Sequence, residues 1–328
     1  MNSNELHESQ SDCVFCGKSE CSETYSCTDT RGNQWSWGRC ESCGTLSLLP
    51  HPTAADLSLA YDTSYYGSSD TKFEGLSEKF ISYCRRGRAR KLAVMLQPKA
   101  RVLDIGCGSG EFLAALSAYG DYELWGTELS GPAASRATKH QGVNLKVGPL
   151  CADDFEEHSF DMVTLFHVFE HLPNPSEVIE SVRRILKPDG HLIMSFPNIN
   201  SWQAKLFKGN WLHLDPPRHL FLMPPASFER EIRNFGFEIE SRQFYSIEQN
   251  PYGFIQSLLN QAGFPRDLLY ERLKGNNDYS PEYGSWSVMG QKFIAGLCLL
   301  PAVFLDAIES TLGKGATVLY HLKRTTSS

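Results

Sequence analysis

Residues 104–110, Asp-Ile-Gly-Cys-Gly-Ser-Gly, place one carboxylate in front of three glycines at alternate positions, Gly106, Gly108 and Gly110. Glycine is needed where a backbone turns sharply and a ligand must approach with no Cβ in the way. A carboxylate at Asp104 repels a pyrophosphate, and Glu111 stands where the dinucleotide fingerprint has glycine. The turn therefore indicates a ligand with a cationic or hydroxyl-rich part.

A second carboxylate follows at the end of the next strand-like run. That run, residues 123–127, leads into Glu128, at the distance where nucleoside-binding turns grip a ribose diol. Together the two carboxylates and the glycines predict a nucleoside site. The alternative is an ordinary strand–helix turn in a parallel sheet.

Three stretches match a known family. Residues 104–111 resemble the first motif of class I S-adenosylmethionine-dependent methyltransferases, residues 159–175 are similar to the fourth strand and following helix, and residues 185–198 to the turn into the fifth strand. The resemblance covers residues 98–245 and names no acceptor. It implies an α/β fold with a Rossmann-like, mostly parallel seven-stranded sheet, helices on both faces, and S-adenosylmethionine as the methyl donor.

The resemblance also implies which residues contact the donor. Asp104 and the glycine turn would position the methionine and ribose parts, and Glu128 would bind the ribose hydroxyls. Leu150 and Cys151 would border the adenine, and Phe166 would lie near the transferable methyl group. The family often has an aspartate near residue 150, whereas the acidic residues here come slightly later, at positions 153 and 154.

Two histidines frame the sequence His167-Val-Phe-Glu-His171. The letters fit the inverted zinc-peptidase pattern H-x-x-E-H, but they follow a strand and no third ligand stands downstream in the usual context. In the methyltransferase interpretation His167 lies at a strand end beside the methyl group, as general base for a hydroxyl acceptor or as a residue lining the site. His171 is expected to be a structural helix residue.

Residues 211–220, Trp-Leu-His-Leu-Asp-Pro-Pro-Arg-His-Leu, are dense in groups that recognise polar substrates. Arg218 could pair with a carboxylate or phosphate, and His219 could serve as base. We expect Asn198, Trp211 and Arg218 to contact the acceptor; the alternative is a loop that only shapes the pocket. Similar loops occur in methyltransferases that carry an N-terminal zinc ribbon.

Four of the ten cysteines form two Cys-x-x-Cys pairs, Cys13 with Cys16 and Cys40 with Cys43, each followed by glycine. Two such pairs predict one tetrahedral Zn²⁺ site, and four thiolates leave no position for a substrate, so the site is expected to be structural. A redox dithiol would need only one pair. Two further cysteines between the pairs, Cys21 and Cys27, could compete as ligands or be free.

The elements that must position these residues divide the chain into three parts. We expect a zinc ribbon over 1–50, a linker and helical cap over 51–98, and the methyltransferase domain over 99–328. Alternating patterns predict strands near 101–105, 123–127, 143–147, 160–166, 190–196 and 237–244, and helices near 110–118, 131–140, 176–187 and 226–235. The cap holds three tyrosines and a basic run, which is either a solvated face or a clamp on an anionic group (Tyr61, Tyr65, Tyr66; residues 85–91).

Residues 246–312 break this alternation and precede a last strand-like run at 316–322. In the family an antiparallel strand is inserted beside the fifth, so 246–312 is expected to be a helical insertion before it. Residues 293–305 are uncharged. They are too short to span a membrane. They could form a buried helix or a dimer contact, or an interfacial helix that lies on a membrane or holds a lipid-linked substrate.

Composition and net charge narrow the range of functions that we expect for this chain. The net charge of −7 gives no broad electrostatic reason to bind nucleic acid. The polar first residues show no secretory signal, so we expect a cytoplasmic protein, which would be peripheral to the membrane if 293–305 forms an interfacial helix. The leading hypothesis is methyl transfer to a hydroxyl of a small-molecule or glycan acceptor. The alternatives are a sugar C-methyltransferase, a zinc-ribbon RNA methyltransferase and a non-catalytic nucleoside-binding protein; the oligomeric state is left open.

Overall fold

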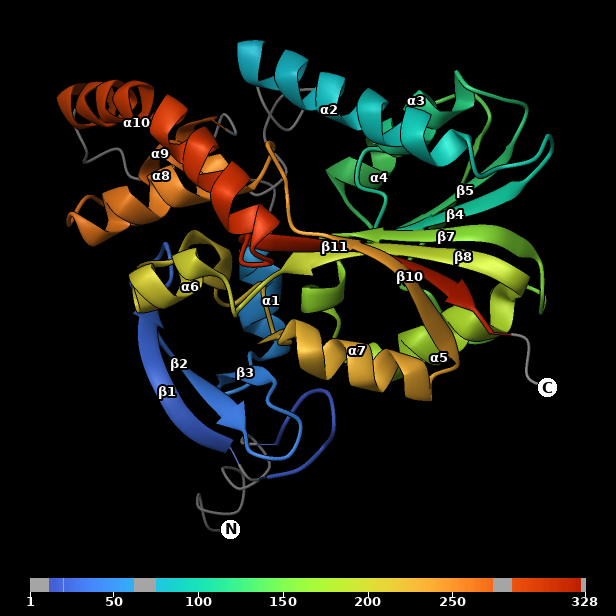
Figure 1. Cartoon of the computed structure of the whole chain (residues 1–328), viewed down its shortest axis with the longest axis horizontal. Coiled ribbons are helices and arrows are strands. Elements are labelled where there is room, and N and C mark those ends of the chain that lie inside the picture. Colours follow the sequence, from blue (N-terminus) through green and yellow to red (C-terminus); the bar gives the residue numbers. More distant parts are fainter. Residues whose placement is uncertain (1–11, 20, 62–74, 274–284, 326–328) are drawn as a thin grey trace.

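The computed structural model describes residues 12–19, 21–61, 75–273 and 285–325. Two sheets organise it: a small antiparallel sheet near the N-terminus and a large central sheet covered by helices (Figure 1). The predicted tyrosines Tyr65 and Tyr66, and the polar N-terminal residues, lie outside the described residues.

The strands and helices have the following bounds. The strands are β1 (Cys21–Thr28), β2 (Gln34–Cys40), β3 (Leu46–Leu49), β4 (Arg101–Ile105), β5 (Glu123–Glu128), β6 (Val143–Val147), β7 (Phe160–Phe166), β8 (Leu186–Pro197), β9 (Phe221–Leu222), β10 (Phe237–Gln243) and β11 (Thr317–Arg324). The helices are α1 (Ala54–Ala60), α2 (Gly75–Ala93), α3 (Glu111–Ser117), α4 (Pro132–Ala137), α5 (Pro175–Ile185), α6 (Trp202–Phe207), α7 (Pro225–Asn234), α8 (Asn250–Gln261), α9 (Leu268–Leu273) and α10 (Ser285–Thr311).

The central sheet has seven strands in the order β10-β11-β8-β7-β4-β5-β6. Its strands are parallel except β11, which pairs antiparallel with both β8 and β10. In Figure 1, α2, α3 and α4 cover one face and α5 and α7 the other. The predicted fold class is confirmed, including the late antiparallel strand beside the fifth strand of the domain.

Helix α5 shows how the local sequence builds this layering. Pro175 occupies the first turn, where its missing N–H costs nothing. Ile179, Val182 and Ile185 recur at three-residue spacing and are all buried against the sheet. The parallel strands therefore carry helices that bury one apolar stripe each, and their carboxyl ends meet at a common edge.

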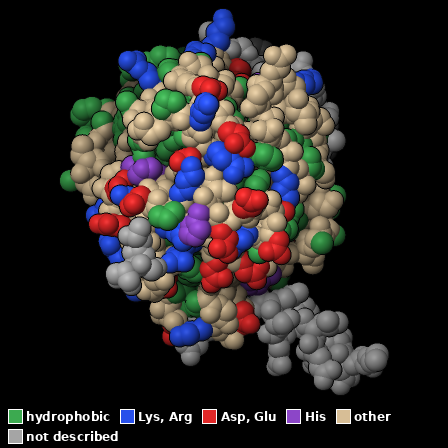
Figure 2. All heavy atoms as spheres, turned by 90° about the vertical axis from the view of Figure 1, so that its right-hand side faces the viewer, with side chains coloured by type: hydrophobic (Ala, Val, Ile, Leu, Met, Phe, Trp, Pro, Cys, Tyr) green, Lys and Arg blue, Asp and Glu red, His purple; other side chains and the backbone are tan. Residues whose placement is uncertain are grey.

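The opposite, amino edge of the parallel strands faces the viewer in Figure 2, which looks at the right-hand side of Figure 1. Lysine and arginine side chains alternate there with aspartate and glutamate. This face therefore offers no patch of single sign for a polyanion.

The N-terminal module, the described part of residues 12–50, contains β1, β2 and β3. Its sheet takes a fourth strand from far along the chain, because β3 pairs with β9 through Leu46 opposite Leu222 and Ser47 opposite Phe221. The strand β9 directly follows the predicted substrate loop. Backbone hydrogen bonds thus connect the N-terminal module to the strand that ends this loop.

The region between β10 and β11 is helical and holds α8, α9 and α10. The acidic residues of α10, Asp306 and Glu309, are buried against Asn250 and Gln203. Its outer side is apolar and exposed, with Phe293 at 68% and Leu300 at 79%. This exposure contradicts a buried helix for residues 293–305. By length and composition alone, α10 could cross a membrane.

Candidate functional site

The glycine turn joins β4 to α3 at the carboxyl edge of the sheet. Gly106, Gly108 and Gly110 all have positive φ, at 66°, 57° and 77°. A Cβ on Gly106 would lie 2.6 Å from Cγ2 of Val168, whereas one on Gly108 would meet nothing within 4 Å. The turn therefore needs glycine for its shape, and at Gly108 it leaves the open approach that a ligand requires.

Glu128, at the end of β5, is bound to this turn. Its Oε2 accepts a hydrogen bond of 2.7 Å from the amide of Gly108, and its Oε1 accepts one of 2.9 Å from the amide of Leu129. The carboxylate is 9% exposed. The two strand ends predicted to share a site are thus joined directly.

Asp104 is the buried carboxyl at the end of β4. Burial raises its pKa to about 7, although a 2.6 Å hydrogen bond from the Thr164 hydroxyl and the charge of Arg88 act in the opposite direction. The nearby charge of Glu128 raises the pKa further. A cation placed between these two carboxylates would favour the ionised form of Asp104.

Arg88, in the basic run 85–91, contacts Phe166 at the carboxyl edge. The guanidinium of Arg88 lies 4.6 Å from the centre of the Phe166 ring and 2.6 Å from Oε2 of Glu248. Arg86 and Arg90 are exposed. The run thus combines exposed residues with the half-buried Arg88, and nothing in the spacing of the run distinguishes Arg88 from its neighbours.

The predicted adenine border follows β6. Leu150 is buried in the core, and Cys151 is exposed. Asp154 accepts hydrogen bonds from the backbone amide of Cys151 and from Lys146, so its carboxylate braces its own loop. Asp153 is exposed beside it.

His167 lies directly after β7 and has a φ of 55°, in the left-handed region that non-glycine residues rarely adopt. Its amide donates to the Ser195 carbonyl at 2.9 Å, which holds it against the end of β8. Its Nδ1 is 3.5 Å from Oε1 of Glu170, and its side chain is 26% exposed. A histidine held at a strand end by a buried carboxylate is suited to accept a proton.

Behind His167 is a buried histidine cluster, which we define as Glu170, His171 and His219. Burial raises the pKa of Glu170, lowers that of His171 to about 4, and lowers that of His219. The hydroxyl of Tyr61 lies 2.9 Å from Nδ1 of His171. Both pKa shifts favour the neutral imidazole. His219 comes from a loop remote in sequence from His171.

The predicted acceptor residues Asn198, Trp211 and Arg218 are all buried. Trp211 is fully buried in the core beneath the N-terminal module, and the Asn198 amide donates to Gly315 and accepts from Asn200. Arg218 is buried and bound to Asp215 through two hydrogen bonds. The structure therefore brings His219 and His167 to the same oxygen of Glu170, and it engages the side chains of Asn198 and Arg218 within the protein.

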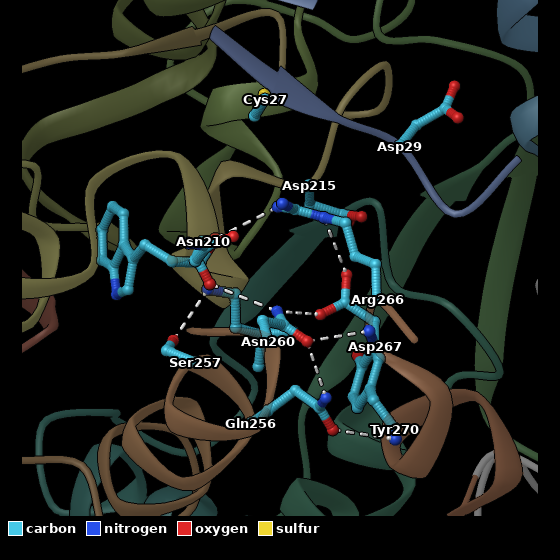
Figure 3. A network of polar contacts seen from close by, with 12 residues as sticks. Cys27, Asp29, Asn210, Asp215, Gln256, Ser257, Asn260, Arg266, Asp267 and Tyr270 are labelled. Atoms are coloured by element: carbon cyan, nitrogen blue, oxygen red, sulfur yellow. Dashed lines mark hydrogen bonds and ion pairs between the residues drawn. The ribbon is translucent and has the colours of Figure 1, made fainter. Parts of the chain in front are cut away.

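A polar network joins this loop to the helical insertion (Figure 3). The amide of Leu212 donates to Ser257, Arg266 donates to the Gly209 carbonyl at 2.7 Å, and Asn260 donates to Asp267 at 2.8 Å. A cavity of about 600 Å³ lies beside it, between β1 and α8, and none of the predicted site residues lines it. The network fixes the loop from behind.

The four predicted cysteine ligands converge at one end of the N-terminal module. The sulfur of Cys13 is 3.5 Å from that of Cys43, and the sulfur of Cys16 is 3.6 Å from that of Cys40. All four lie within 4.8 Å of one another. Cys27 is elsewhere, accepting from the Trp37 indole at 3.3 Å, so it is not a competing ligand.

The strand order and the carboxylates at the ends of β4 and β5 define the class I methyltransferase type of nucleoside-binding fold. A family model described as "Methyltransferase domain" matches residues 77–242, about half of the chain. The chain belongs to this family, and it is an S-adenosylmethionine-dependent methyltransferase.

Curated relatives are similar over part of the chain. The ubiquinone biosynthesis O-methyltransferase of Neisseria meningitidis serogroup A is 30% identical over 109 residues, which are 30% of this chain and 45% of that protein. That of Paraburkholderia phymatum is 35% identical over 106 residues, again 30% and 45%. The chain thus spans about half the length of these relatives.

Among solved structures, an S-adenosylmethionine-dependent methyltransferase from Mesorhizobium loti is 16% identical, with a TM-score of 0.44. The match covers 73% of this chain and all of that one.

Proposed function

We propose that this methyltransferase transfers its methyl group to a hydroxyl of a small-molecule or glycan acceptor. The observation that carries the proposal is the shared edge: Asp104, Glu128 and the open glycine turn lie on one side of it, and His167 on the other. Bound S-adenosylmethionine supplies a methyl group activated by the sulfonium charge. The protein has to align donor and acceptor and exclude water.

The donor half of the site is assigned to β4 and β5. Glu128 would bind the ribose hydroxyls, and Asp104 would face the positive end of the donor. Leu150 and Cys151 would border the adenine, and Phe166, under Arg88, would line the methyl end. Because there is free space where a Cβ of Gly108 would be, the donor can approach the backbone of the turn closely.

We assign the base to His167. Its ring is partly exposed, and Glu170 lies 3.5 Å from Nδ1, so the imidazolium formed on proton uptake would be stabilised by a carboxylate. His219 is almost fully buried and faces the same carboxylate from 3.8 Å. We therefore place His219 in support of the site rather than against the acceptor.

The N-terminal module is proposed to hold one structural Zn²⁺ on Cys13, Cys16, Cys40 and Cys43. Four sulfur atoms around one centre match the ligand set of structural zinc sites. Because β3 pairs with β9, a metal that orders the module also orders the chain that follows His219. We expect the metal to serve the acceptor side without touching substrate.

Calorimetric titration with S-adenosylmethionine and S-adenosylhomocysteine tests the donor assignment; binding of NAD in place of both would contradict it. Radiolabelled methyl transfer into separated small-metabolite, glycan, lipid and RNA fractions then tests the acceptor class. A methyl group attached to carbon in the product would overturn the hydroxyl assignment, and label in RNA at high salt would overturn the small-molecule or glycan acceptor. The variant His167→Gln should bind the donor normally and lose turnover.

A further inference from the structure

We propose that the buried histidine cluster, Glu170, His171 and His219, is a second metal site, for a divalent first-row transition metal. One ligand atom from each residue lies within 4.8 Å of the others. The cluster is separate in sequence and chemistry from the four cysteines. The inference concerns metal binding and does not depend on the identity of the methyl acceptor.

Each imidazole has its Nδ1 fixed by a backbone carbonyl, as ligating histidines usually have one ring nitrogen fixed. Nδ1 of His171 is 2.8 Å from the carbonyl oxygen of Arg218, and Nδ1 of His219 is 2.8 Å from that of His213. An Nδ1–H that donates to a backbone carbonyl leaves the lone pair on Nε2. Ligating histidines are usually fixed by this second hydrogen bond. The rings meet at a centroid distance of 4.6 Å.

The third residue supplies the observation that points to a ligand. Glu170 is 1% exposed, and among the described residues neither of its carboxylate oxygens has a hydrogen-bond partner. Its Oε1 is 3.8 Å from Nε2 of His219 and 3.5 Å from Nδ1 of His167. A buried carboxylate without a hydrogen bond is costly, and a bound cation would satisfy it.

The donor set selects the metal class. Two imidazole nitrogens and one carboxylate oxygen suit zinc or iron(II) and their neighbours in the first row, and disfavour calcium and magnesium, which prefer oxygen. Three protein ligands leave at least one position open. His167 adjoins Glu170, so the open side would lie next to the proposed base.

A second group of the same composition provides the control. His191, Glu240 and His321 also lie within 4.8 Å of one another. Their polar atoms already pair: Nε2 of His321 is 3.1 Å from Nδ1 of His191 and 2.9 Å from Glu240, whose side chain is 35% exposed. We assign no metal to this group.

Metal content of the full chain tests the proposal. After loading with Zn²⁺ and desalting, elemental analysis should give about two zinc ions per wild-type chain. Glu170→Gln and His219→Gln should each lose one, Cys40→Ser should lose the other, and the control His321→Gln should lose none. Retained donor binding and circular dichroism would show that the variants are folded.

Should a variant fail to fold, Co²⁺ substitution of the wild type decides. The proposal expects one ion with intense sulfur-to-cobalt absorption and a second with only weak d–d bands. A single ion that disappears with the cysteines would overturn it, as would a second ion that follows His321 instead of His219.

Discussion

The donor side and the acceptor side of the site are built in opposite ways. The donor side lies within residues 104–128, where a strand, a turn and the next strand end place two carboxylates together through Gly108. The acceptor side gathers Tyr61, the pair His167 and Glu170, and His219 from three separate segments. Its loop is bonded to the helical insertion and its next strand to the N-terminal module.

This difference indicates that donor binding is a local property and acceptor handling a global one. A short sequence can specify the donor side because its contacts are close along the chain. The acceptor side exists only when three parts of the molecule are assembled. Substitutions on one side of the site should therefore affect donor binding or acceptor methylation without affecting the other. Four experiments test this expectation.

The largest effect should come from removing the proposed structural zinc. Structural zinc contributes on the order of 10 kcal/mol to the folding of small modules, so Cys40→Ser should unfold the N-terminal module and release β9. We expect acceptor methylation to fall by about 100-fold or more while donor affinity changes by less than about 3-fold, a difference near 2 kcal/mol. Titration calorimetry and limited proteolysis measure the two outcomes. Loss of donor binding in equal proportion would mean that the sides are not separable.

The next effect should come from Glu128→Ala. This change removes the acceptor of two backbone hydrogen bonds, and bonds to a charged group contribute about 1.5–3 kcal/mol each, so donor affinity should fall by about 100-fold. Zinc content should be unaffected. Glu123→Ala is the matched control: it lies on the same strand, is exposed and pairs with Arg101 at 3.0 Å. An equal loss in the control would implicate the strand instead of the carboxylate.

A pH effect should follow from Asp104. Its pKa in the folded protein is about 7, above its ordinary value of 3.8, so the native state holds the proton more tightly than the unfolded chain. Its stabilising contribution is complete below pH 3.8 and is lost as pH rises through 7. Urea unfolding of the donor-free protein between pH 5 and pH 8 should show this decline, and Asp104→Asn should flatten it.

Donor affinity should change in the opposite direction, because an ionised Asp104 attracts the sulfonium. Affinity of the wild type is expected to rise between pH 6 and pH 8, with little change in the Asn variant. An identical pH profile in the two proteins would remove Asp104 from the donor site.

The smallest effect should come from Tyr61→Phe, which deletes the hydroxyl 2.9 Å from His171. One hydrogen bond contributes about 1 kcal/mol, so the KM for the acceptor should rise about 5-fold, with donor affinity unchanged. The control Tyr83→Phe removes a hydroxyl from a side chain that is 71% exposed on α2. A shift in donor affinity for Tyr61→Phe would contradict the assignment of Tyr61 to the acceptor side of the site.

Much of the fold could be predicted because periodic patterns report burial directly. The seven strands of the central sheet and four of its helices lie where the sequence placed them, and α5 begins at the Asn-Pro signal. The pairing of β3 with β9 was missed, because a two-residue strand carries no periodicity and its partner is far away in the sequence. The exposure of α10 could not be predicted from the sequence either, because an uncharged run is compatible with both a buried and an exposed helix.

The site was predictable in the same uneven way. The glycine turn and Glu128 have a motif. Glu170 is part of the H-x-x-E-H pattern in the sequence. Only the tertiary structure shows that its carboxylate is buried without a hydrogen bond and lies beside His219. Trp211 was expected to contact the acceptor because of its indole, but the structure buries it in the core.

By itself the sequence determined the strand–helix alternation, the glycine turn with its two carboxylates, and the paired cysteines, because each depends on chemistry within a few residues of the chain. Tertiary structure alone decided which of the five basic residues in 85–91 reaches Phe166, and that the remote His219 meets Glu170. It also decided that a strand following the substrate loop completes the N-terminal sheet. These outcomes depend on burial and on contacts between remote segments, which are set only when the whole chain packs.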